Sequence, residues 1–267
     1  MGKLIYRFNN LGSKGSMNSK EILGGKGANL AQMVKLGLPV PPGFTISTSV
    51  CEYFYKNNKK IPKKVIQQAI KEIKVIEKIS KKKFGDSSNP LLVSVRSGSR
   101  VSMPGMMDTI LNLGLNDETV VGLKKKTSNG RFAKDSYRRL IQMYGNVALG
   151  IESHFFEELI ENYKLTKGVI QDTELEEEDW DGLIQNFKDV VKEKTKKNFP
   201  QDVNEQLWGA IGAVFLSWNS TRAKTYRKIN YIPDHWGTAV NIQAMVFGNM
   251  GNDCATGVAF TRNPSTG

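Results

Sequence analysis

Short alternating or apolar runs lie towards both ends of the chain, and a helical period occupies much of the middle. The pattern predicts strands at residues 4–8, 44–48, 91–95, 109–115, 238–247 and 255–261. The fourth of these is predicted to return beside the third as a hairpin. The last two are separated by the glycine-rich turn GNMGND, which predicts a second hairpin.

Helical spacing predicts a helix from Ala28 to Leu36, which Gly37 can close in the left-handed conformation. A longer helix is predicted from Asn204 to about Lys228. Its predicted apolar side consists of Leu207, Trp208, Ile211, Phe215 and Trp218. Between residues 117 and 200 several further helical patterns replace the β-branched runs. We therefore expect a mixed α+β fold with a helical insertion.

Charge is uneven along the chain, whose formal net charge is +12. Residues 56–83 carry eleven lysines, while apolar residues recur there at helical spacing: Val65, Ile66, Ala69, Ile70, Ile73 and Ile76. This favours an amphipathic helix with a solvated lysine face over a polyanion-binding module. The acidic stretch DTELEEEDWD (172–181) suits an exposed loop that leads into a helix start.

Composition also limits the function classes. The sequence holds no run of 18 apolar residues and no signal-peptide pattern at its N-terminus, so we expect a cytoplasmic protein with no membrane or nucleic-acid partner. Cys51 and Cys254 have no cysteine or histidine nearby at metal-ligand spacing, so neither a disulfide framework nor a zinc site is predicted. His154 and His235 lack the neighbours of a catalytic base.

The first candidate site is Gly24-Gly25-Lys26-Gly27, immediately before the helix of residues 28–36. Glycines let backbone amides turn towards a ligand, and a helix N-terminus and a lysine both favour a phosphate. The Walker pattern GxxxxGK[ST] does not match here. From these residues alone, a phosphate loop and an ordinary tight turn are equally plausible.

The second candidate is VSVRSGSRVSMPGMMDT (93–109), where Arg96 directly follows an apolar strand. An arginine fork at a strand end can engage two phosphate oxygens. Gly98 and Gly105 would permit a mobile flap, and Met103 would supply soft apolar surface. Local chemistry alone slightly favours a plain surface hairpin with solvated arginines.

The third candidate is the strand segment QAMVF, from Gln243 to Phe247. A strand that runs into a glycine turn can offer its backbone N–H and C=O groups to the edge of an adenine. Nothing in the residues requires this role, and from the residues alone a core strand is the better interpretation.

Taken together, these segments and their order resemble the N-terminal nucleotide-binding domain of the pyruvate, phosphate dikinase family. The blocks that carry the resemblance are EILGGKGANLAQMVKLGLPVPPGFTIST, PLLVSVRSGSRVSMPGMMDTILNLGLND and FLSWNSTRAKTYRKINYIPDHWGTAVNIQAMVFGNMGNDCATGVAFTRNPSTG. They cover roughly half of the chain. The segment SGSRVSMPGMMDT separates this family from the related phosphoenolpyruvate synthases, which are the alternative.

The resemblance implies an ATP-grasp-like fold with two α+β subdomains around the nucleotide. It assigns residues 1–116 and 201–237 to the first subdomain, 117–200 to a helical insertion and 238–267 to the start of the second subdomain, which would be incomplete. The implied reaction converts ATP, phosphate and pyruvate to AMP, pyrophosphate and phosphoenolpyruvate through a phosphohistidine on a swivelling domain.

The resemblance also implies roles for individual residues. Lys26 and Arg96 match residues that contact ATP phosphates, and Arg100 would only shape the flap. The segment Gln243, Met245 and Val246 matches the strand that faces adenine. The loop that carries Met103, Gly105 and Thr109 matches the segment that closes over the triphosphate.

Other parts of the family pattern are missing from the sequence. No T-S-H-A phosphohistidine motif occurs. The resemblance places the Mg²⁺ ligands, the histidine domain and the pyruvate-binding barrel beyond residue 267, and it implies that the full enzyme is a homodimer. We therefore expect that the chain alone is inactive.

Overall fold

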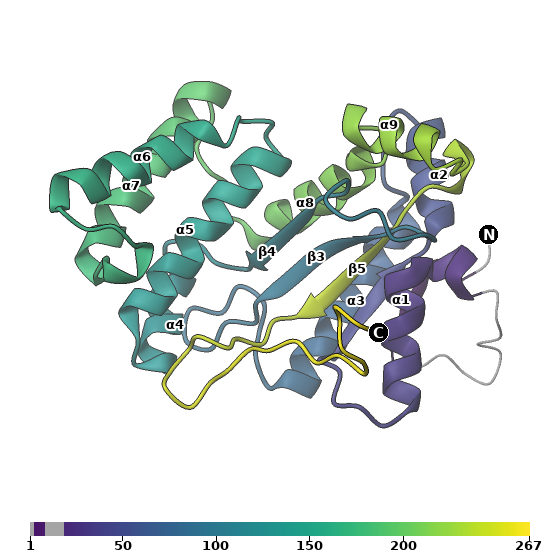
Figure 1. The fold of residues 1–267 in the computed structure, drawn as a ribbon, viewed down its shortest axis with the longest axis horizontal. Helices are drawn as coiled ribbons and strands as arrows, with labels where there is room; N and C mark the ends of the chain where they lie inside the picture. The colour runs from purple at the N-terminus through teal and green to yellow at the C-terminus, as the bar shows by residue number, and fades with distance from the viewer. Residues whose placement is uncertain (1–2, 9–18) are drawn as a thin grey trace.

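The computed structural model describes residues 3–8 and 19–267. Its centre is a five-stranded sheet in the order β1–β2–β5–β3–β4, in which every neighbouring pair is antiparallel (Figure 1). The strands are β1 Ile5–Arg7, β2 Gly43–Ile46, β3 Val93–Gly98, β4 Thr109–Leu113 and β5 Ala239–Ala244. The predicted hairpin of β3 and β4 is therefore confirmed.

One face of the sheet is apolar and fully covered. Because side chains alternate along a strand, the register places the following buried residues on the same face: Phe44, Ile46, Val93, Val95, Ile110, Val240 and Ile242. Helices α3 (Lys63–Ser80) and α8 (Val203–Ser217) lie behind the sheet in Figure 1 and contact its strands, and α2 (Thr48–Lys56) contacts β5. This side forms the hydrophobic core.

The opposite face is polar and only partly covered. Thr45, Asn241, Arg96 and Thr109 are register partners from β2 to β4, so they form a polar row across four strands. Helix α1 (Ser19–Lys35) lies in front of this face and contacts β2, β3 and β5 (Figure 1). The polar row makes this face the candidate for ligand binding.

Helix α3 is amphipathic, as its lysine spacing predicts. Val65, Ala69, Ile73 and Ile76 are buried in the core, whereas Ile70 is 41% exposed. The predicted apolar stripe is thus narrower than expected on its Ile70 side.

The predicted helical insertion is helical in the structure. It comprises α4 (Thr119–Thr127), α5 (Gly130–Val147), α6 (His154–Lys167) and α7 (Glu177–Thr195), with α5 packed against β4. The acidic stretch leads into the start of α7, as predicted, and Glu177 pairs with Lys124 and Lys134. Among the residues described, no helix has the length and hydropathy of a membrane-spanning segment.

Two sequence predictions are wrong. The single helix predicted from residue 204 to 228 is two helices, α8 and α9 (Thr221–Ile229), because Ser220 accepts a hydrogen bond from the Ala223 N–H at 3.3 Å and so begins a new helix. Residues 255–261 form no strand, and Val258 and Phe260 are 80% and 66% exposed. The domain boundary predicted at residue 238 lies immediately before β5, which hydrogen-bonds to both β2 and β3.

Candidate functional site

The Gly24–Gly27 segment forms a kink inside α1, where Gly24 has a φ of 67° and a ψ of 172°. A Cβ atom on Gly24 would overlap the carbonyl group of Gly98 at the end of β3. The Gly25 N–H donates a hydrogen bond of 2.8 Å to the Ser99 carbonyl. These glycines therefore let α1 approach the end of β3 closely, in addition to any role in binding a ligand.

Gly27 has a related packing role against the polar row of the sheet. A Cβ atom there would lie 2.7 Å from Oγ1 of Thr45 and 3.0 Å from Oδ1 of Asn241. Those two side chains are buried and joined by a 2.7 Å hydrogen bond. The helical turn that carries Lys26 is thus held directly against the polar face.

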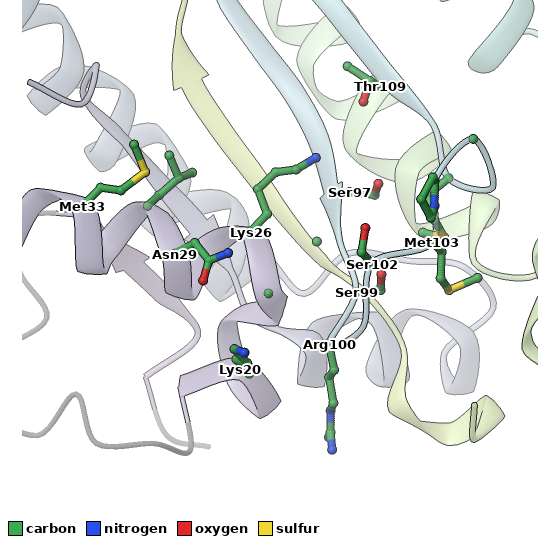
Figure 2. Close-up of a pocket in the computed structure, with 16 residues that line it drawn as sticks. Lys20, Lys26, Asn29, Met33, Ser97, Ser99, Arg100, Ser102, Met103 and Thr109 are labelled. Atoms are coloured by element: carbon green, nitrogen blue, oxygen red, sulfur yellow. The ribbon is translucent and has the colours of Figure 1, made fainter. Parts of the chain in front are cut away.

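Lys26 extends over the sheet towards β3, between the labelled Ser97 and Thr109 (Figure 2). Burial, and to a smaller extent the nearby positive charge of Arg96, together lower the pKa of its ammonium group to about 8. Among the described residues, neither Lys26 nor Arg96 forms a salt bridge with a carboxylate. The two cations therefore form a positive centre that lacks an anion.

A cavity of about 650 Å³ lies beside this centre. Helix α1 contributes Lys20, Lys26 and Met33 to its lining. The end of β3, the β3–β4 loop and the start of β4 contribute four hydroxyl-bearing residues: Ser97, Ser99, Ser102 and Thr109. Cations and hydroxyl donors in one concave site are suited to an oxyanion such as a phosphate.

Arg100 differs from Arg96 in its surroundings. Its side chain points away from Lys26 in Figure 2, and its guanidinium carbon lies 5.0 Å from the centre of the Trp236 ring. Stacking of this kind holds the arginine against the aromatic face. Arg100 also lines the cavity, but its guanidinium group packs on Trp236 rather than beside Lys26.

Comparison with known proteins agrees with a cavity suited to phosphate groups. A family model described as "Pyruvate phosphate dikinase, AMP/ATP-binding domain" matches residues 20–83 and 59–267. The chain belongs to this dikinase family.

Individual relatives support the same assignment. The chain is 54% identical over 267 residues to pyruvate, phosphate dikinase of Rhizobium meliloti and 52% identical over 268 residues to that of Clostridium symbiosum. It is 52% identical over 265 residues to the chloroplastic pyruvate, phosphate dikinase of Flaveria pringlei. These matches cover 99–100% of this chain but only 28–30% of the relatives' length. The alternative of a phosphoenolpyruvate synthase is not favoured.

Four of the site residues predicted for this dikinase domain line the cavity: Lys26, Met103, Gly105 and Thr109. Arg96 is the register partner of Thr109 and lies close enough to Lys26 to lower its pKa. Met103 is also part of the hydrophobic core and only 6% exposed, so it anchors the loop as well as forming its inner surface. Gly105 has a φ of 72° and no atom within 4 Å of where its Cβ would lie, which places it at a free loop tip.

The structure does not bring the predicted adenine-facing residues into this cavity. Gln243 is buried in the central strand, and its side-chain amide donates a 3.2 Å hydrogen bond to the Pro41 carbonyl. The Met245 N–H is also used, in a 2.9 Å bond to the Leu92 carbonyl. Val246 is 73% exposed just beyond the strand. Their contact with adenine remains a prediction.

Two residues of the site escaped prediction from the sequence. Asp108 follows Met107 at the end of the cavity loop, and its carboxylate forms an ion pair with Arg222 in α9. The segment STRAK that holds Arg222 lies within one of the family-like blocks. Nothing in its local pattern indicates a partner more than a hundred residues away.

Proposed function

We propose that this chain is the nucleotide-binding part of a pyruvate, phosphate dikinase, and that Lys26 and Arg96 hold the phosphates of ATP. The observation that carries the proposal is the positive centre itself. Two cations lie close together beside a cavity of about 650 Å³, and Lys26 has its pKa lowered by burial and by Arg96. A polyphosphate would supply the missing negative charge, and the hydroxyls of Ser97 and Thr109 would add hydrogen bonds.

The roles of these residues are positioning and charge neutralisation, which dominate phosphoryl transfer. Lys26 and Arg96 would hold the phosphate chain over the polar row of the sheet. The loop with Met103 and Gly105 would exclude water from one side. In the whole enzyme, ATP, phosphate and pyruvate would give AMP, pyrophosphate and phosphoenolpyruvate, with the phosphohistidine and pyruvate sites supplied by other parts of the protein.

The Mg²⁺ ligands are expected outside the described residues. No three His, Cys, Asp or Glu side chains come together in that part of the chain. Asp108, the carboxylate beside the cavity, is already paired with Arg222. We therefore assign no step to the ion in this chain.

We also propose an ATP-grasp-like architecture, with residues 238–267 leading towards a second subdomain that would cover the open polar face. The incomplete cover of that face by α1 supports this arrangement. Homodimerisation remains a prediction. A cytoplasmic location also remains a prediction, because some relatives are named chloroplastic.

Proton uptake on ATP binding tests the role of Lys26. With a pKa of about 8, Lys26 of the nucleotide-free protein is mostly neutral at pH 9 and mostly charged at pH 7. If bound phosphate restores the charge of Lys26, ATP binding is expected to take up about 0.9 proton at pH 9 and about 0.1 proton at pH 7. Affinity should accordingly fall as the pH rises above 8. Calorimetric titration with ATP in two buffers of different ionisation enthalpy measures the uptake directly.

Two variants make the calorimetry specific. Lys26→Met should abolish the uptake at pH 9, whereas Lys20→Met, which removes another lysine that lines the cavity, should retain it. Equal uptake in the wild-type protein and in Lys26→Met would show that Lys26 does not contact the nucleotide.

A further inference from the structure

The β3–β4 loop, residues 99–108, forms one wall of the cavity and is tied down at both ends. At its start, the Ser99 carbonyl accepts a hydrogen bond from the Gly25 N–H of α1 at 2.8 Å. Near its end, the loop contacts α8 through Ser217 and α9 through Arg222. Between these ties, Pro104 and Gly105 are exposed.

The second tie is made mainly by Arg222, in the first turn of α9. Its Nη2 atom pairs with Oδ1 of Asp108, and its Nε atom donates to the Met106 carbonyl at 3.3 Å. The Asp108 N–H adds a longer bond of 3.4 Å to Oγ of Ser217. One guanidinium thus holds both a side chain and the backbone of the loop.

The position of Asp108 makes its pairing important for the charge of the cavity. It lies between Met107 and Thr109, which both line the cavity, and Thr109 is the register partner of Arg96. Its side chain is only 20% exposed, and burial raises the pKa of the carboxyl group while Arg222 opposes the rise. A free carboxylate here would compete with a phosphate for Arg96 and Lys26.

We propose that Arg222 is a positioning residue for the phosphate-binding cavity: it tethers the β3–β4 loop and keeps the Asp108 carboxylate away from Lys26 and Arg96. The inference rests on the proposed function, because it takes the cavity to bind the phosphates of ATP. It has two separable parts, a mechanical tether and a neutralised charge.

Hydrogen–deuterium exchange and ATP titration on the same variants separate the two parts. In Arg222→Met, the amides of residues 99–108 should exchange about tenfold faster, and the dissociation constant for ATP should rise by about tenfold. Adding Asp108→Asn should recover most of the affinity, since the competing charge is gone, but should leave the loop exchange fast. Arg222→Lys, which keeps the charge and loses the fork, should retain most of the affinity.

The control is Lys224→Met, which removes an exposed cation from the same helix and should change neither measurement. If the amides of residues 99–108 exchanged as slowly in Arg222→Met as in the wild-type protein, Arg222 would not tether the loop. If adding Asp108→Asn to Arg222→Met did not restore the affinity for ATP, neutralising the Asp108 carboxylate would not be a role of Arg222. The exchange measurement needs no nucleotide. A wild-type chain that fails to bind ATP would therefore count against the proposed function, while the exchange result would still decide the tether.

Discussion

Gly24→Ala is expected to destabilise the protein by about 3 to 5 kcal/mol, the largest effect of any single small substitution in α1. Gly24 has a φ of 67°, which L-residues other than glycine rarely adopt, and a Cβ atom would overlap the Gly98 carbonyl. To make room, α1 would have to move away from β3, and the hydrogen bond from Gly25 to Ser99 would be lost. Urea denaturation followed by circular dichroism measures the change in the free energy of unfolding.

Gly37→Ala is a matched control for the contact with β3. Gly37 follows the same helix and has a φ of 79°, but no atom lies within 4 Å of where its Cβ would be. It shares the positive φ without the overlap, so the substitution should cost only about 1 kcal/mol. An equal loss of stability in the two variants would refute the close approach of α1 to β3 as the reason for the glycine.

Lys26→Met and Arg96→Met are each expected to weaken ATP binding by roughly tenfold to a hundredfold, because each removes a charge-assisted contact with phosphate. The stability of the nucleotide-free protein should change in the opposite sense to its affinity for ATP. Each substitution removes one of two neighbouring, partly buried like charges, so the free energy of unfolding should rise slightly. Titration with ATP measures the loss of affinity, and urea denaturation measures the gain in the free energy of unfolding.

Arg100→Met provides the comparison for this pair. It removes an arginine that also lines the cavity, but one whose side chain stacks on Trp236 and points away from Lys26. Affinity for ATP should be nearly unchanged. If Arg100→Met weakened binding as much as Arg96→Met, the assignment of the phosphate contacts would be wrong.

The sequence predicted those features that depend on local pattern. Alternation predicted β1, an apolar run with a returning partner predicted the β3–β4 hairpin, and helical spacing predicted α3 with its lysines outside. The resemblance also grouped Lys26 and Arg96, which the structure does bring close together. These features were accessible because each depends on residue type and spacing within a short segment, or on a motif shared across the family.

Features that depend on distant partners were not predictable in this way. The kink at Gly24 is explained by the carbonyl of Gly98, on a strand far along the chain. The loop ending at Asp108 depends on Arg222, 114 residues later. For residues 255–261, the apolar pattern suggested a strand, but a strand also needs a partner, and none of the described strands pairs with this segment.

The place of β5 in the sheet sets the order in which the fold can be completed. It is the middle strand, yet it comes last among the described strands, and Thr45 and Asn241, which meet across β2 and β5, are 196 residues apart. Until residue 244 has left the ribosome, β2 and β3 each present an unpaired edge to other chains. Closing the sheet is therefore a late, long-range step, and we expect slow, all-or-none assembly of the surface on which Lys26 and Arg96 meet.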